Sequence, residues 1–149
     1  MLRPVLLFLH LAGVIVWVGG MAFAYFCLRP AAARVLDPPQ RLPLWAAAFA
    51  PFFRLVGIAI ALIFLSGFAM LLQTGFAVAP MAWYVMLVLG FAMAGVFAYV
   101  DRGLYPALRR HCGTSDWPAA AAALNRIRQC VAVNLVLAVC TVGAAVSSR

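Results

Sequence analysis

Four long apolar segments constrain the fold of this chain more than any other feature. They run roughly over residues 5–27, 55–73, 81–100 and 129–146, and each is near the ~20 residues that an α-helix needs to cross a bilayer. The chain is 68% hydrophobic and 9% charged, with a mean hydropathy of +1.08. A soluble domain averages roughly half apolar and a quarter charged residues. We therefore predict an integral membrane protein.

The apolar segments are typical of helices rather than of a β-barrel. They lack the strict alternation that a transmembrane β-strand shows, and backbone groups in lipid must be satisfied internally, which leaves four α-helices. The short turn QTGFAVAP at residues 73–80 joins the second and third segments and contains the helix breakers Gly75 and Pro80. We predict an all-α fold, a membrane four-helix bundle of two helical hairpins, as a single transmembrane domain over residues 1–149.

Arginine supplies all eleven basic residues, and its placement predicts the orientation. Arg3 and Arg149 lie at the termini, whereas the other nine lie in or beside two long links, residues 28–54 and 101–127. The positive-inside rule then places both links in the cytoplasm and both termini outside, in a bacterial-type inner membrane. The same rule explains the net charge of +8, so we predict the lipid bilayer as a partner and no nucleic acid. The nine arginines are Arg29, Arg34, Arg41, Arg54, Arg102, Arg109, Arg110, Arg126 and Arg128.

Both long links carry signals for helix starts. Asp37 precedes Pro38, and Ser115 or Asp116 lies shortly before Pro118, which is the usual order of an N-cap and a first-turn proline. The second of these helices is expected to run unbroken into the last apolar segment, to a length of about 45 Å.

A weak internal repeat relates the two halves of the chain. A shift of 74 residues places Phe23-Ala24-Tyr25 on Phe97-Ala98-Tyr99, and a further slip of two residues places Pro30 on Pro106. If the halves are duplicated, the two hairpins are related by a pseudo-two-fold axis along the membrane normal. Apolar sequences also match by chance, so duplication and coincidence both stay open.

His10 is the ionisable residue near the start of the apolar stretch FLHLAGVIVWVGGMAFAYFC, residues 8–27. Trp17 and Met21 follow it on one face of a helix. An ionisable side chain inside a membrane span is costly and usually faces the bundle interior or a cavity. His10 is therefore either a ligand or a structural hydrogen-bonding residue.

The outer half of the bundle offers two sets of ligands around His10. In the first, His10 with Met86, Met70 and Cys140 would bind copper, because imidazole, thioether and thiol groups suit Cu(I). In the second, His10 would be an axial ligand of haem b, with Tyr84 or Met86 as the other ligand and Trp17 beside the macrocycle. The second histidine, His111, lies in a cytoplasmic link. Two imidazoles at one site would thus require a homodimer.

Three stretches of the sequence resemble the short, four-span members of the CopD-like copper-resistance membrane proteins. They are LHLAGVIVWVGGMAFAYFCLRPAA, LDPPQRLPLW and DWPAAAAALNRIRQCVAVNLVLAVCTVG. The His-plus-Trp first span is also remotely similar to the HemJ-type protoporphyrinogen oxidases, which are thought to bind haem b. The resemblance implies copper handling at the inner membrane, with His10 as a site residue and a periplasmic copper carrier as a partner.

Three functions are therefore open at this point. The first is copper transport or homeostasis around His10, and the second is a haem-b redox protein that uses His10 as axial ligand. The third is a structural subunit of a membrane complex. We expect no catalytic residues in the first and third cases, and an oxidoreductase only if haem is bound.

Overall fold

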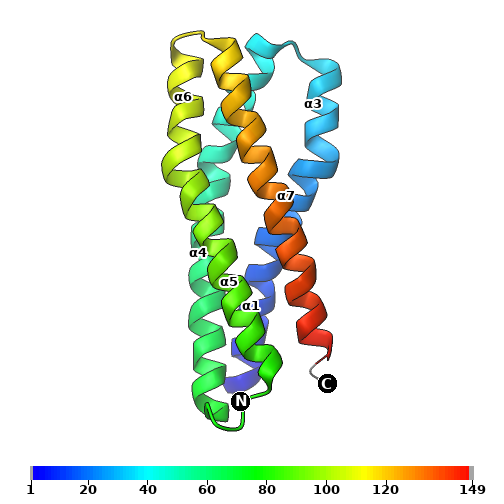
Figure 1. Ribbon diagram of the computed structural model, residues 1–149, viewed down its shortest axis with the longest axis vertical. Helices are drawn as coiled ribbons and strands as arrows, with labels where there is room; N and C mark the ends of the chain where they lie inside the picture. The colour runs from blue at the N-terminus through cyan, green and yellow to red at the C-terminus, as the bar shows by residue number, and fades with distance from the viewer. Residues whose placement is uncertain (1, 148–149) are drawn as a thin grey trace.

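The computed structural model describes residues 2–147, and four long helical segments make up nearly all of that range (Figure 1). This confirms the predicted all-α membrane four-helix bundle. The first segment contains α1 (Leu2–Val14), η1 (Ile15–Gly19), α2 (Gly20–Phe23), η2 (Ala24–Leu28) and α3 (Arg29–Val35). The second is α4 (Pro38–Thr74); the third contains α5 (Met81–Tyr99), η3 (Val100–Leu104) and α6 (Tyr105–Gly113); the fourth is α7 (Trp117–Ser147).

The helical segments extend well beyond the predicted spans. They contain 34, 37, 33 and 31 residues, which corresponds to about 46–56 Å, whereas the hydrocarbon core of a bilayer is ~30 Å thick. The two predicted links are therefore mainly continuations of the membrane helices. Non-helical backbone in them is confined to residues 36–37 and 114–116. We call the end of the bundle at these two loops the arginine-rich end, and the end that holds residues 75–80 the opposite end.

The predicted helix starts in the links are confirmed. Pro38 opens α4, and the backbone carbonyl of Asp37 accepts hydrogen bonds from the amides of Gln40 and Arg41 at 3.0 and 2.8 Å. Asp116 caps α7 with its side chain, because the amide of Ala119 donates to its Oδ1 at 3.2 Å. Local turn chemistry thus begins both helices that return into the membrane.

Two of the three π-helical segments are explained by proline. η2 and η3 end just before Arg29-Pro30 and Tyr105-Pro106. A proline has no amide hydrogen and crowds the carbonyl four residues earlier, so the helix widens there. The two segments are 76 residues apart, the same shift that aligns Pro30 with Pro106. The shared spacing of these two segments therefore follows from the two prolines, and the repeat stays a prediction.

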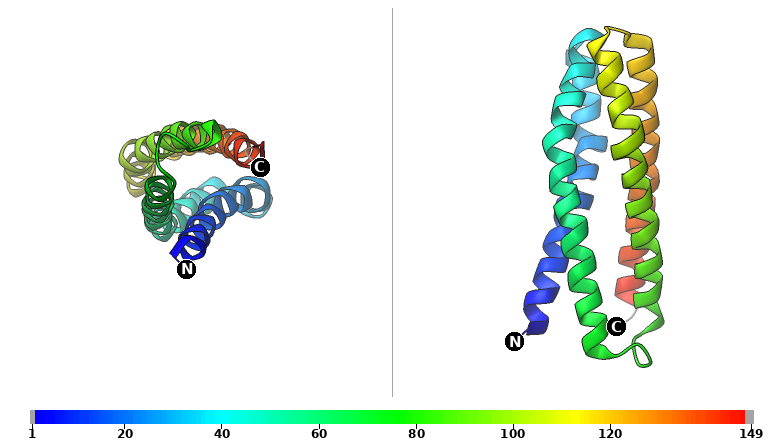
Figure 2. Two further views of the ribbon diagram at one scale, coloured as in Figure 1. Left: turned by 90° about the horizontal axis from the view of Figure 1, so that it is seen from below. Right: turned by 90° about the vertical axis from the view of Figure 1, so that its left-hand side faces the viewer.

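Packing is tightest at the arginine-rich end and in the middle of the bundle. α1 lies along α4, while α5 and α6 lie along α7 (Figure 2). One buried cluster forms where α4, α6 and α7 meet; it contains Leu42, Trp45, Phe49, Phe53, Val100, Leu104, Leu108, Ala120, Ala123 and Ile127. The second lies in the middle of the bundle and contains Trp17, Met21, Val56, Ala59, Met93 and Ala138.

The contact between α1 and α4 depends on Gly13. A Cβ atom at this position would lie 2.8 Å from Ile63 Cγ1 and 2.9 Å from the backbone oxygen of Ala59. Small residues allow membrane helices to approach closely where lipid provides no hydrophobic driving force. Gly19, on the same helical segment, has open space where its Cβ would be, so it provides a matched control.

We expect Gly13→Ala to destabilise the protein by about 1–3 kcal/mol, since the helix backbone of α4 must shift to admit the methyl group. Gly19→Ala is expected to be neutral or slightly stabilising, because alanine is the better helix former. Thermal unfolding in mild detergent, followed by circular dichroism, measures both. Equal melting temperatures for the two variants would contradict the close approach at Gly13.

Candidate functional site

His10 lies half-buried on α1 and is bound to α4. Its Nδ1 is 3.0 Å from the carbonyl oxygen of Ile63 and 3.2 Å from Ser66 Oγ. A carbonyl can only accept, so Nδ1 carries the proton and donates it. The ring also lies close to the backbone of α4, because a Cβ at Gly67 would be 3.3 Å from His10 Cε1. One hydrogen bond therefore fixes both the ring and its tautomer.

This tautomer leaves the lone pair of the neutral imidazole on Nε2. Among the described residues, the buried side-chain polar atoms without a partner are Thr74 Oγ1 and Asn134 Oδ1. Nε2 of His10 is not one of them and has no hydrogen bond, so it is not fully enclosed by the protein. Metal-binding histidines usually donate their other ring nitrogen to a carbonyl or carboxylate in this way. The arrangement satisfies the buried N–H and at the same time presents a ligand atom.

Of the three predicted sulfur ligands, Met70 is the one on α4, the helix to which His10 is hydrogen-bonded. It follows Ser66 by one helical turn, so it lies on the face of α4 that holds Ile63 and Ser66, one turn closer to the opposite end. The structure describes Met70 as half-buried. A flexible thioether at this position lies on the α1-facing side of α4.

The other two predicted sulfur ligands lie on different helices. Met86 is half-buried on α5 and shares a helical face with the buried Met93, seven residues later. Cys140 is exposed on α7. It follows the buried Ala138 by two residues, about 200° around the helix, and therefore faces away from the bundle. The structure does not bring Cys140 toward His10 within one copy of the chain.

Both side chains predicted to contact a haem make other contacts within the protein. The Tyr84 hydroxyl donates to the carbonyl of Phe76 and thereby ties α5 to the preceding turn. Trp17 is 4% exposed and packs edge-to-face on Phe97, with ring centroids 6.4 Å apart. The cavity that Trp17 lines holds about 30 Å³, which suits a single water molecule. These residues do not fit a haem.

That small cavity in the middle of the bundle brings together polar and sulfur groups from distant segments. Met21, Cys130 and Asn134 line it with Trp17. Asn134 Nδ2 donates to the carbonyl of Met93 at 3.2 Å, as expected for a polar residue between membrane helices, while its Oδ1 has no partner. Sequence reasoning did not identify this cavity.

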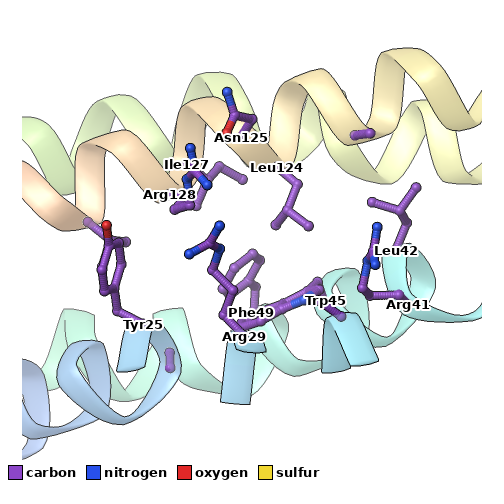
Figure 3. Close-up of a pocket in the computed structure, with 14 residues that line it drawn as sticks. Tyr25, Arg29, Arg41, Leu42, Trp45, Phe49, Leu124, Asn125, Ile127 and Arg128 are labelled. Atoms are coloured by element: carbon purple, nitrogen blue, oxygen red, sulfur yellow. The ribbon is translucent and has the colours of Figure 1, made fainter. Parts of the chain in front are cut away.

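A larger cavity of about 210 Å³ lies at the arginine-rich end, between the first helical segment, α4 and α7 (Figure 3). Arg29, Arg41 and Arg128 line it together with Tyr25 and Asn125. Sequence reasoning assigned these arginines to membrane orientation alone. The spacings Tyr25–Arg29 and Asn125–Arg128 place each pair on one helical face, which is the signal that could have grouped them.

Among residues 2–147, no group of three or more His, Cys, Asp or Glu side chains could hold a metal ion. A soft metal bound by one copy would therefore need thioether ligands beside His10.

Comparison with known proteins gives one match. A family model described as copper resistance protein D matches residues 46–148, which is more than half of the chain. No curated protein and no solved structure matches the chain, and the remote similarity to HemJ-type enzymes is not shown. Met70, Met86 and Cys140 lie inside the matched range, whereas His10 lies outside it.

Proposed function

Because the chain belongs to the copper resistance protein D family, we propose that it handles copper as cargo in the membrane, in transport or homeostasis. The site lies in the half of the bundle toward the opposite end, and His10 is its centre. The ion is Cu(I), since the available donors are an imidazole and thioethers, which prefer soft metals. Copper keeps its oxidation state in this proposal, so no electron donor is required.

The hydrogen bond from His10 Nδ1 to the Ile63 carbonyl, at 3.0 Å, is the observation that carries the proposal. In the neutral imidazole it places the lone pair on Nε2, and it orients the ring without occupying the ligand atom. Met70, on the same face of α4 as Ile63 and Ser66, supplies the first thioether. Met86 on α5 supplies the second.

A homodimer and a periplasmic copper carrier complete the proposal. Two copies would contribute two His10 imidazoles, and the outward-facing Cys140 of one copy would be available to the other. A carrier outside the membrane would deliver Cu(I) at the opposite end. The homodimer follows from the short supply of ligands in a single chain, and the carrier follows from the copper-resistance family.

The two roles of His10 are separated by the variants His10→Asn and His10→Ala. The amide N–H of asparagine lies close to the position of Nδ1 and can donate to the Ile63 carbonyl, but asparagine has no counterpart of Nε2. We expect His10→Asn to keep its melting temperature within a few degrees and to bind Cu(I) at least tenfold more weakly. His10→Ala should lose both stability and copper binding. Competition with a chromogenic Cu(I) chelator measures the affinity of the purified protein.

Met70→Leu and Met93→Leu form a matched pair for the thioether. Both conserve volume, but Met93 lies in the packed core and we assign it no ligand role. Weaker Cu(I) binding in Met70→Leu alone is the expected result. Wild-type affinity in His10→Asn would overturn the copper site at His10 and leave this residue a structural hydrogen-bonding role.

We also propose that the arginine-rich end faces the cytoplasm. In a cysteine-free protein, Thr114→Cys places a thiol in the loop at that end, and Ala77→Cys places one in the turn at the opposite end; both positions are exposed. A membrane-impermeant maleimide should label position 77 in right-side-out vesicles and position 114 only in inverted vesicles. The reverse pattern would contradict the proposed orientation.

A further inference from the structure

The 210 Å³ cavity at the arginine-rich end is not explained by copper handling. Its buried floor consists of Trp45 and Phe49, each 6% exposed. Tyr25 and Arg29 point from the first helical segment toward α7, and Arg128 lies on α7 opposite them (Figure 3). The cavity therefore combines an apolar floor with guanidinium groups on both sides.

The arginines of this cavity have no acidic partner in the part of the chain that the structure describes. The whole sequence contains three acidic residues, Asp37, Asp101 and Asp116. The ion pair found among residues 2–147 joins Asp116 to His111 at 3.7 Å. Arg29 instead lies over the ring of Tyr25, 5.8 Å from its centroid. Like charges around one half-enclosed space repel each other, and an anion between them would remove that repulsion.

With the hydrocarbon core placed over the predicted spans, the cavity lies at the depth of the phosphate layer. Twenty helical residues span about 30 Å, the thickness of the hydrocarbon core. Residues 5 and 146 are the ends of the first and last predicted spans at the opposite end of the bundle. Twenty residues from residue 5 the first segment reaches Tyr25, and twenty residues back from residue 146 α7 reaches residue 126, so these positions mark the hydrocarbon boundary at the arginine-rich end. Arg29 and Arg128 thus lie within a few ångströms of the hydrocarbon boundary, whereas Arg41 lies farther from the membrane centre.

We propose that this cavity binds the phosphate headgroup of an anionic membrane lipid. Arginine pairs with phosphate through two parallel N–H donors, and basic pockets between membrane helices on the cytoplasmic side are suited to anionic lipid headgroups. The apolar walls at Leu124 and Val131 suit the start of an acyl chain. A small soluble phosphate would use the arginines but gain nothing from these walls. The proposal is independent of the copper site.

The test compares lipids on the purified full-length protein in neutral maltoside micelles. We expect dioleoylphosphatidylglycerol to raise the melting temperature by several degrees in a saturable way. Dioleoylphosphatidylcholine, which carries no net charge, and millimolar inorganic phosphate should have little effect. Native mass spectrometry should show one phosphatidylglycerol retained per chain. A saturable shift of equal size with inorganic phosphate would overturn the lipid in favour of a soluble anion.

A pair of double variants separates the cavity from general surface charge. Arg29→Gln with Arg128→Gln removes two arginines that line the cavity, and Arg34→Gln with Arg126→Gln removes two arginines of the same two helical segments that do not line it. Each double variant lowers the net charge by the same amount. We expect the first to weaken phosphatidylglycerol binding at least tenfold and the second to bind as the wild type does. Equal losses in the two would overturn the proposal.

A third variant keeps the test decisive if the cavity double variant does not fold. Leu124→Trp retains all the arginines and fills the cavity with a bulky side chain. Loss of the phosphatidylglycerol shift in this variant supports binding inside the cavity. An unchanged shift would place the lipid elsewhere and overturn the proposal.

Discussion

The helices of this protein are longer than the hydrocarbon core is thick, and much of the structure follows from that excess. Segments of about 46–56 Å cannot be contained in ~30 Å of hydrocarbon, so part of each helix must project into headgroups and water. Only there does the hydrophobic effect drive helices together, because lipid chains are as apolar as leucine. The large buried cluster around Leu42, Trp45 and Leu108 accordingly lies at the arginine-rich end.

Within the hydrocarbon core, close approach and hydrogen bonds replace hydrophobic burial. Gly13 brings α1 against the backbone of α4. His10 then donates to the Ile63 carbonyl on that helix, and Asn134 joins α7 to α5 through the Met93 carbonyl. Each such bond removes most of the cost of a polar group in lipid. The opposite half of the bundle can therefore hold a histidine without a large core around it.

The sequence was sufficient to predict the elements of this fold but not their mutual rotation. Hydropathy located four spans, and Asp37 and Asp116 marked helix starts that the structure confirms. The sequence predicted where helices begin in the two links, but not that the links are almost entirely helical. A first-turn proline marks the start of a helix, whereas the local sequence does not mark where the preceding helix ends. The larger cavity requires side chains from three separate helical segments and the smaller one from four, so no spacing within one segment predicts their volumes.

A purely structural role for His10 does not explain why this position holds an imidazole rather than a smaller hydrogen-bond donor. A residue needed only to bind the Ile63 carbonyl requires one donor, and serine, threonine or asparagine would provide it. Imidazole brings a second polar nitrogen, whose desolvation has a cost unless that atom is used. Here Nδ1 carries the hydrogen, so the lone pair of the neutral ring lies on Nε2, which is not fully enclosed by the protein. His10 lies outside the range matched by the copper resistance family, so its proposed role rests on this geometry.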